Sequence, residues 1–274
     1  MMKLGKSTLA LFVLLPLLCV IYLSVVSAWT YPLLFDAEFS LKHYLVLFSG
    51  ESELAWSFVQ SVLLSLVMAT LGLLFGFFVA KEIAFSKYGS RLLKLAFYPY
   101  MIAPVVLGSM LQFYFVRWGL SASFFGVMLA QSLFILPYAV LIMSSFWSEN
   151  ILQLFKLGQS LGGDAKTVKR TLLYPLAKPW MLLTFAQCFL ISWFEYGITQ
   201  VLGIGKVKTL SVISMQFLKE ANPHPAAVAA VLMIVPVLLT FIILYRWQNK
   251  AQGNWSAIAP INNSLSHHPK KVGA

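Results

Sequence analysis

The chain has 274 residues, of which 59% are hydrophobic and only 11% are charged, and its mean hydropathy is +0.81. Soluble domains carry about 25% charged residues, so this composition excludes a soluble globular protein. The net charge of +11 could suggest nucleic-acid binding, but the basic residues are distributed between loops as membrane topology requires.

Six windows of the chain carry no charge or a single one, and each is long enough to cross a bilayer. A helix needs roughly 20 apolar residues to span the ~30 Å hydrocarbon core. The sequence therefore predicts an all-α polytopic membrane protein with a membrane domain over residues 1–251. A polar tail, residues 252–274, lacks periodicity and is expected to be disordered. The six predicted spans lie near residues 9–29, 57–80, 95–116, 124–146, 181–201 and 226–245.

The basic residues predict the orientation of these spans. The two termini and the loops after the second and fourth spans hold fifteen lysines and arginines, whereas the other three loops hold five. Basic loops stay in the cytoplasm, so both termini are expected there. Six of the nine acidic residues lie toward the opposite side. This distribution accounts for the basic excess without a nucleic-acid partner.

The first half of the chain shows few local signals. The first outer loop is long enough for a short surface helix around Leu41–Phe48. Gly72 and Gly76 of the second span have GxxxG spacing, which favours close packing against a neighbouring helix of the same chain. Pro99 and Pro104 predict a bend in the third span, because proline removes a backbone donor.

The cytoplasmic segment between the fourth and fifth spans, residues 147–179, is long and patterned. An apolar stripe predicts a first helix, which Gly162 and Gly163 interrupt. Asp164 can cap a second helix at its N-terminus, and Tyr174-Pro175 is expected to end that helix. The stripe comprises Ile151, Leu152, Leu154, Phe155 and Leu161. A helix–glycine–helix element of this kind can be gripped by another protein, or it can rest on lipid headgroups.

This segment resembles the signature of the permease subunits of binding-protein-dependent ABC importers of the type I fold. That signature is E-A-A, three residues, G, nine residues, then I-x-L-P. It fits Lys156-Leu157-Gly158, Gly162 and Leu172-Leu173-Tyr174-Pro175 without gaps, with Lys156 in place of the acid and Tyr174 in place of leucine. A looser resemblance, carried by Trp193–Gly197 and Thr209–Val212, is to permeases of polyamine, thiamine and ferric-iron uptake.

The resemblance implies a multi-pass subunit of the bacterial inner membrane that forms half of a translocation pathway. It implies three partners: a cytoplasmic ABC ATPase dimer, a second six-span permease, with a heterodimer favoured over a homodimer, and an external solute-binding protein. ATP and magnesium would be used by the ATPase, and this chain would bind no cofactor. The residues expected to couple to the ATPase are Lys156, Gly158, Gln159, Ser160, Leu161, Gly162, Gly163, Asp164 and Pro175.

Glu195 is the single charge in the fifth predicted span, roughly 22 Å beyond Trp180 at 1.5 Å per residue. An ionisable group at this depth is a functional candidate. An acid beside aromatic rings could attract a cationic solute, such as a polyamine or a thiamine-like compound. Alternatively, Glu195 and its aromatic neighbours anchor the span at the membrane surface. The candidate path residues are Gln112, Tyr114, Trp193, Glu195, Tyr196 and Gln200.

Two other classes of function can be compared with the sequence, a membrane-embedded enzyme and a protein that works without an ATPase. A membrane-embedded enzyme would need convergent catalytic groups at one depth, but all four histidines lie outside the predicted spans and Glu195 has no acidic companion in one. We predict no catalytic residue and no metal site. A secondary carrier or membrane assembly factor that works without an ATPase remains open, and ATP-independent uptake by this chain alone would favour it.

Overall fold

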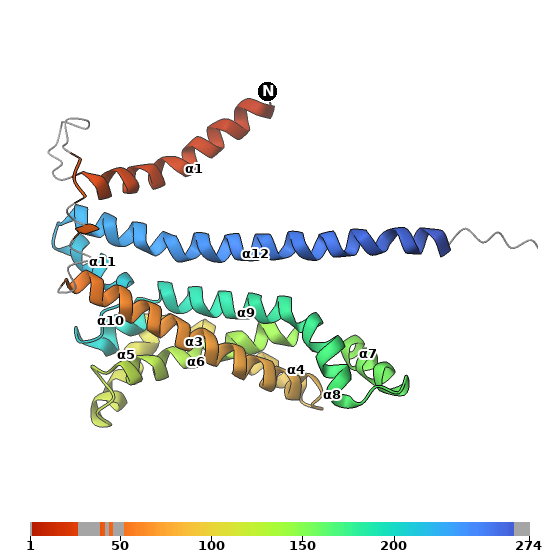
Figure 1. Ribbon diagram of the computed structural model, residues 1–274. Coiled ribbons are helices and arrows are strands. Elements are labelled where there is room, and N and C mark those ends of the chain that lie inside the picture. The colour runs from red at the N-terminus through yellow and green to blue at the C-terminus, as the bar shows by residue number, and fades with distance from the viewer. Residues whose placement is uncertain (1, 27–38, 42–43, 46–51, 266–274) are drawn as a thin grey trace, which may run out of the picture. The chain divides into compact units, whose positions relative to one another are not determined.

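The computed structural model describes residues 2–26, 39–41, 44–45 and 52–265, and these residues are predominantly helical (Figure 1). The first half of the chain contains α1 (Met2–Val25), α3 (Glu53–Ala84), α4 (Gly89–Phe97), the short 3-10 helix η1 (Tyr98–Met101), α5 (Pro104–Arg117) and α6 (Phe124–Ser144). The second half contains α7 (Glu149–Ser160), α8 (Ala165–Val168), the π-helical turn η2 (Lys169–Leu173), α9 (Tyr174–Phe194), α10 (Gly197–Gly203), α11 (Leu210–Lys219) and α12 (Pro223–Leu265). The fold is all-α over these residues, as the sequence predicts.

Three described helices are long and apolar enough to cross a membrane unbroken: α3, α6 and the Pro223–Trp247 part of α12. Two more candidates are pairs of helices joined at a sharp bend, and counting each pair as one span gives up to five. The described part of α1 contributes only a shorter apolar helix, Leu14–Val25. The number of six spans and the cytoplasmic location of both termini therefore remain predictions.

The two bent pairs replace spans that the sequence predicts as single helices. The third predicted span turns by 91° between Met101 and Pro104, where the proline can begin α5 but cannot continue the preceding helix. The fifth predicted span turns by 54° between α9 and α10. The bend lies at Glu195 and Tyr196, neither of which is a proline or a glycine. The first bend agrees with the proline signal, whereas the second was not predicted.

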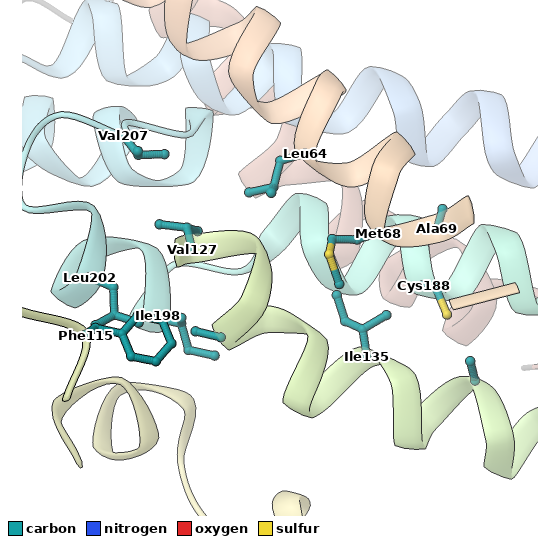
Figure 2. Packing of buried hydrophobic residues seen from close by; sticks show 12 residues of the cluster. Leu64, Met68, Ala69, Phe115, Val127, Ile135, Cys188, Ile198, Leu202 and Val207 are labelled. Atoms are coloured by element: carbon teal, nitrogen blue, oxygen red, sulfur yellow. The ribbon is translucent and has the colours of Figure 1, made fainter. Parts of the chain in front are cut away.

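Helices α3, α6 and α9 lie side by side and form the core (Figure 1). Glycines let their backbones approach: a Cβ atom at Gly72 would lie 2.9 Å from Cys188 Sγ, and one at Gly76 would lie 2.8 Å from the Ala139 carbonyl oxygen. The structure thus confirms that this glycine pair serves packing within the chain. Figure 2 shows the apolar cluster around these contacts, which includes Leu64, Met68 and Ile135.

The chain folds as two compact units, residues 1–234 and residues 235–274. In the second unit α12 continues as a helix to Leu265, so the structure is helical over the first part of the tail that was expected to be disordered from Gln252. Residues 266–274 of that tail lie outside the described residues. So do residues 42–43 and 46–48 of the surface helix predicted at Leu41–Phe48.

Candidate functional site

The loop between α6 and α9 forms a helical hairpin, which we define as the coupling hairpin, residues 149–173. Its first helix, α7, ends at Ser160 with Leu161 as the C-terminal cap residue, and Gly162 adopts a positive φ of 86°, a conformation that favours glycine. Asp164 then begins α8, since its carboxylate accepts a hydrogen bond of 3.2 Å from the backbone N–H of Thr167. Hydrogen bonding to Thr167 lowers the pKa of Asp164. The predicted glycine break and aspartate cap are therefore both present.

The two helices of the hairpin meet at Val168, which is buried. A Cβ atom at Gly158 would lie 2.9 Å from a methyl group of Val168, and one at Gly163 would lie 2.7 Å from the other methyl group. Both glycines therefore make room for one valine. Two of the predicted coupling residues thus have a packing role inside the hairpin, which fixes the angle of its tip.

Aromatic side chains anchor the base of the hairpin to the end of α3. The Trp147 indole donates a hydrogen bond of 3.1 Å to the Phe77 carbonyl oxygen, and Tyr174 stacks on the Phe77 ring with centroids 6.4 Å apart. A cavity of about 420 Å³ lies between the end of α3 and the hairpin, and Ile151 and Leu152 of the predicted apolar stripe line it. The base is thereby tied to the membrane core.

The tip of the hairpin is free of such contacts. Leu161 is 81% exposed, so it points away from the stripe to which the sequence assigned it. Lys156, Gln159 and Ser160 are exposed as well. The structure thus places some predicted coupling residues at the exposed tip. It places two others, Gly158 and Gly163, in the packing contact with buried Val168, which we call the seam.

Pro175 does not end the second helix, contrary to the prediction. The described chain is helical from Ala165 to Phe194, and Pro175 lies in the first turn of α9. The π-helical turn η2 precedes it, and the N–H of Tyr174 bonds to the carbonyl of Lys169, five residues back. This wider turn accommodates the missing donor of the proline, so the hairpin and α9 are joined by one continuous helix.

The second region of interest is the bend between α9 and α10, where the Glu195 side chain turns back onto α10. One carboxylate oxygen accepts a hydrogen bond of 2.6 Å from the N–H of Ile198. The other accepts bonds of 3.0 and 2.7 Å from the N–H and hydroxyl of Thr199. Glu195 therefore satisfies backbone donors at the N-terminus of α10, as an aspartate or serine would at an ordinary helix start.

A buried polar network extends from this carboxylate into α6. The Gln131 amide donates to Glu195 at 3.3 Å and to the Thr199 hydroxyl at 3.1 Å, and it accepts a bond of 2.7 Å from the Ser192 hydroxyl. Gln131, Ser192 and Thr199 are each at most 1% exposed. These three residues were not predicted from the sequence. One signal was present, because Gln131 is the only side-chain amide between Arg117 and Glu149.

Next to the network lies a cavity of about 300 Å³, bordered by the starts of α5 and α10. A Cβ atom at Gly197 would lie 2.9 Å from the backbone nitrogen of Val105, so the two bends touch each other. Glu195, Gln131 and Tyr196 supply the polar part of the wall, and Phe134 and Ile135 belong to its apolar part.

The other predicted path residues do not converge on this cavity. Trp193 is fully buried, stacks on Phe189, and donates a hydrogen bond of 3.1 Å to the Met233 carbonyl oxygen. Gln112 lines a separate hollow on α5, and Tyr114 is 53% exposed.

Tyr196 and Gln200 share the wall of a third hollow, of about 160 Å³. Two lysines also line it, and the Lys219 ammonium lies 3.5 Å from the Tyr196 hydroxyl. Lys208 pairs with Glu53. Of the six predicted path residues, the structure therefore places Glu195 and Tyr196 at the 300 Å³ cavity, and Tyr196 and Gln200 at the third hollow. Residues 52–265 and the described N-terminal segments contain no cluster of three potential metal ligands.

Comparisons with known proteins agree with this architecture. The chain is similar to the crystal structure of a bacterial alginate ABC transporter in complex with an alginate pentasaccharide-bound periplasmic protein, with a TM-score of 0.62 and 14% identity over 88% of this chain and 90% of that one. A second crystal structure, of a bacterial ABC transporter involved in import of the acidic polysaccharide alginate, gives a TM-score of 0.55 and 17% identity over 89% and 94%. These similarities show a shared fold. No curated protein sequence matched the chain.

The family comparison is more direct, because it matches residues 72–253, well over half of the chain, and covers both the coupling hairpin and the Glu195 bend. The chain belongs to the family of binding-protein-dependent transport system inner membrane components, and it is a permease component of an ABC importer.

Proposed function

We propose that this chain forms half of the translocation pathway of an ATP-driven importer in a bacterial inner membrane, and that the coupling hairpin receives the motion of a cytoplasmic ATPase. The observation that carries this proposal is the construction of the hairpin. Its tip, with Leu161 81% exposed, offers a surface to a partner, while Trp147 and Tyr174 fasten its base to α3. A segment that transmits motion needs one end free to bind a partner and one end fixed to the membrane domain.

The family supports the choice of partners. An ATPase dimer would bind the exposed tip and use ATP and magnesium, and a second permease subunit would complete the pathway. An external binding protein would deliver the solute. Coupling requires that the ATPase bind the hairpin differently in its two states, since a ligand shifts an equilibrium only by its differential affinity.

The choice of a cationic solute is not part of this proposal. That expectation was based on an acid beside aromatic rings, but both oxygens of the Glu195 carboxylate accept hydrogen bonds from α10. The described surroundings also include Lys208 and Lys219, on the hollow beside Tyr196. The solute class is better determined by a binding screen on the external protein that copurifies with this subunit.

The test is Gly162→Glu in the assembled transporter, with binding-protein-stimulated ATP hydrolysis as the measurement. Gly119→Glu is the matched control, because Gly119 also has a positive φ, of 67°, and open space around its Cβ position. We expect Gly162→Glu to insert and assemble normally but to lose stimulated hydrolysis, while Gly119→Glu keeps it. Equal stimulation in both variants would contradict the role of the hairpin. Uptake by this chain alone in ATP-free vesicles would instead indicate a secondary carrier.

A further inference from the structure

The bend between α9 and α10 is held by a side chain and not by the local backbone. Glu195 follows the last residue of α9 in an extended conformation, with φ −66° and ψ 124°, and the side chain of Tyr196, at the cap position of α10, makes no capping hydrogen bond. The cap is supplied instead by the Glu195 carboxylate, which is the acceptor in all four of its side-chain hydrogen bonds. Releasing that carboxylate would leave the start of α10 without its acceptor.

The same position joins four helices. Gln131 belongs to α6, Ser192 to α9 and Thr199 to α10, and the Ser211 hydroxyl of α11 donates a bond of 2.7 Å to the Glu195 carbonyl oxygen. Among the described residues, no lysine or arginine pairs with Glu195. Its partners are therefore neutral donors from neighbouring helices, a composition typical of a structural joint.

The joint also lies beside the other bend of the molecule. Gly197, at the start of α10, approaches the backbone of Val105 at the start of α5, and the 300 Å³ cavity lies where these two starts meet. Because the approach is too tight for a side chain at Gly197, a change in the direction of α10 must displace α5 or widen the cavity.

We propose that Glu195 is a positioning residue that holds the α9–α10 bend in its closed form, and that the cavity opens when the carboxylate releases α10. This inference rests on the proposed function, since the bend then lies in the translocation pathway. Glu195 acts here through α10 and makes no contact with the solute. We call the hydrogen bonds between the Glu195 carboxylate and α10 the clamp. These bonds are replaced when α10 is driven to a new angle, so the clamp sets the resting state of the pathway.

The test measures the reactivity of a cysteine placed under the clamp. Ile198 is fully buried and borders the cavity, so Ile198→Cys should react slowly with a membrane-impermeant thiol reagent. The background carries Cys19→Ser because Cys19 is exposed, whereas buried Cys188 stays as an internal reference. The protein is the complete transporter in proteoliposomes, without binding protein or ATP. We expect Glu195→Ala to raise the reaction rate at least tenfold, because it removes all four hydrogen bonds to the carboxylate, and the loss of even one charged hydrogen bond corresponds to about tenfold.

Graded variants make the result specific. Glu195→Gln keeps one acceptor oxygen and should give an intermediate rate. Thr199→Val should do the same, because it removes one donor to the carboxylate and one acceptor of the Gln131 amide with little change of shape. Glu220→Ala is the control, because Glu220 is an exposed acid at the end of α11 that only accepts a bond from Gln216. If Glu195→Ala does not assemble, Thr199→Val decides the outcome.

Three results would overturn the proposal. The first is an unchanged rate at Ile198→Cys in Glu195→Ala. The second is an equal rise at Cys188, which would mean general loosening of the bundle. The third is lost uptake with an unchanged thiol rate, which would make Glu195 a solute contact. Failure of the importer assignment is separate, because it would appear in the parent protein as ATP hydrolysis that the binding protein does not stimulate.

Discussion

The helical chain is interrupted at the coupling hairpin and at the Glu195 bend, and the two interruptions are built differently. At the hairpin, Gly162 takes a positive φ in an exposed tip, and one exposed side chain, Asp164, caps the helix that follows. At the bend, Glu195 keeps an ordinary φ, and buried side chains from several helices hold the break. The comparison indicates that an exposed joint can depend on glycine geometry, whereas a joint at membrane depth needs its freed backbone groups satisfied by side chains.

The largest effect expected from this difference is on stability at the buried joint. Glu195→Leu leaves the N–H groups of Ile198 and Thr199 without their acceptor, and each unsatisfied buried donor costs about 1–3 kcal/mol. We expect the free energy of unfolding to fall by roughly 3 kcal/mol or more. Thermal unfolding of the purified subunit in detergent measures it. Glu220→Leu is the surface control. Equal stability of the two variants would show that the buried joint does not depend on the hydrogen bonds of Glu195.

A second prediction sharpens the description of the hairpin seam. Gly158→Ala should cost about 1–3 kcal/mol through overpacking against Val168, and adding Val168→Ala should relieve that strain because only side-chain atoms clash. Gly163→Ala should not be relieved in the same way, since its new Cβ would also lie 2.8 Å from the Gly158 carbonyl oxygen. Unfolding measurements on the two double variants test this. Equal rescue at both glycines would show that the backbone contact at Gly163 is unimportant.

A third prediction distinguishes the core from the pathway. Trp193→Phe keeps an aromatic ring against Phe58 and Phe189 but loses the hydrogen bond to the Met233 carbonyl oxygen. We expect a loss of about 1 kcal/mol in stability, with uptake kinetics unchanged. A shift in the apparent affinity for solute, with stability unaltered, would instead support Trp193 as a residue of the pathway.

The smallest effect is expected at the cap of the exposed joint. Asp164→Ala removes the acceptor for the Thr167 N–H and should modestly loosen the tip of the hairpin. Because hydrogen bonding to Thr167 lowers the pKa of Asp164, its contribution is present above the ordinary aspartate pKa and is lost as the pH falls through the lowered value. The protection factors of the amides at residues 164–168, corrected for the intrinsic pH dependence of exchange, should therefore fall in acid for the parent protein and change less for the variant.

Much of the fold could be predicted from the sequence, because apolar runs, prolines and glycines are local signals. The apolar runs locate α3, α6 and the first part of α12, Pro99 and Pro104 indicate the bend before α5, and the glycines mark the tip of the hairpin. The bend at Glu195 could not be predicted in this way. Its stabilising partner, Gln131, lies 64 residues earlier in the chain, and their contact exists only after α6 and α9 pack together.

The candidate site shows the same difference between features set by neighbouring residues and features set by tertiary packing. The glycine break and the Asp164 cap depend on neighbouring residues, so the sequence predicted them correctly. Leu161 lies at the exposed tip, beyond the last residue of α7, and the helix continues through Pro175 by way of the π-helical turn, so both predictions were wrong. An acid in an apolar span drew attention to Glu195, but its role depends on the donors that surround it.

The most direct measurement of the central claim is cross-linking from the tip of the hairpin. Leu161→Cys, in a Cys19→Ser background, places a reactive group at a position of the tip that is 81% exposed. In an assembled, transport-active complex, we predict that this cysteine forms a cross-link to the ATPase and that the yield changes when ATP binds. A complex that imports solute while Leu161→Cys stays free of the ATPase in every nucleotide state would contradict the proposal that the hairpin carries the motion.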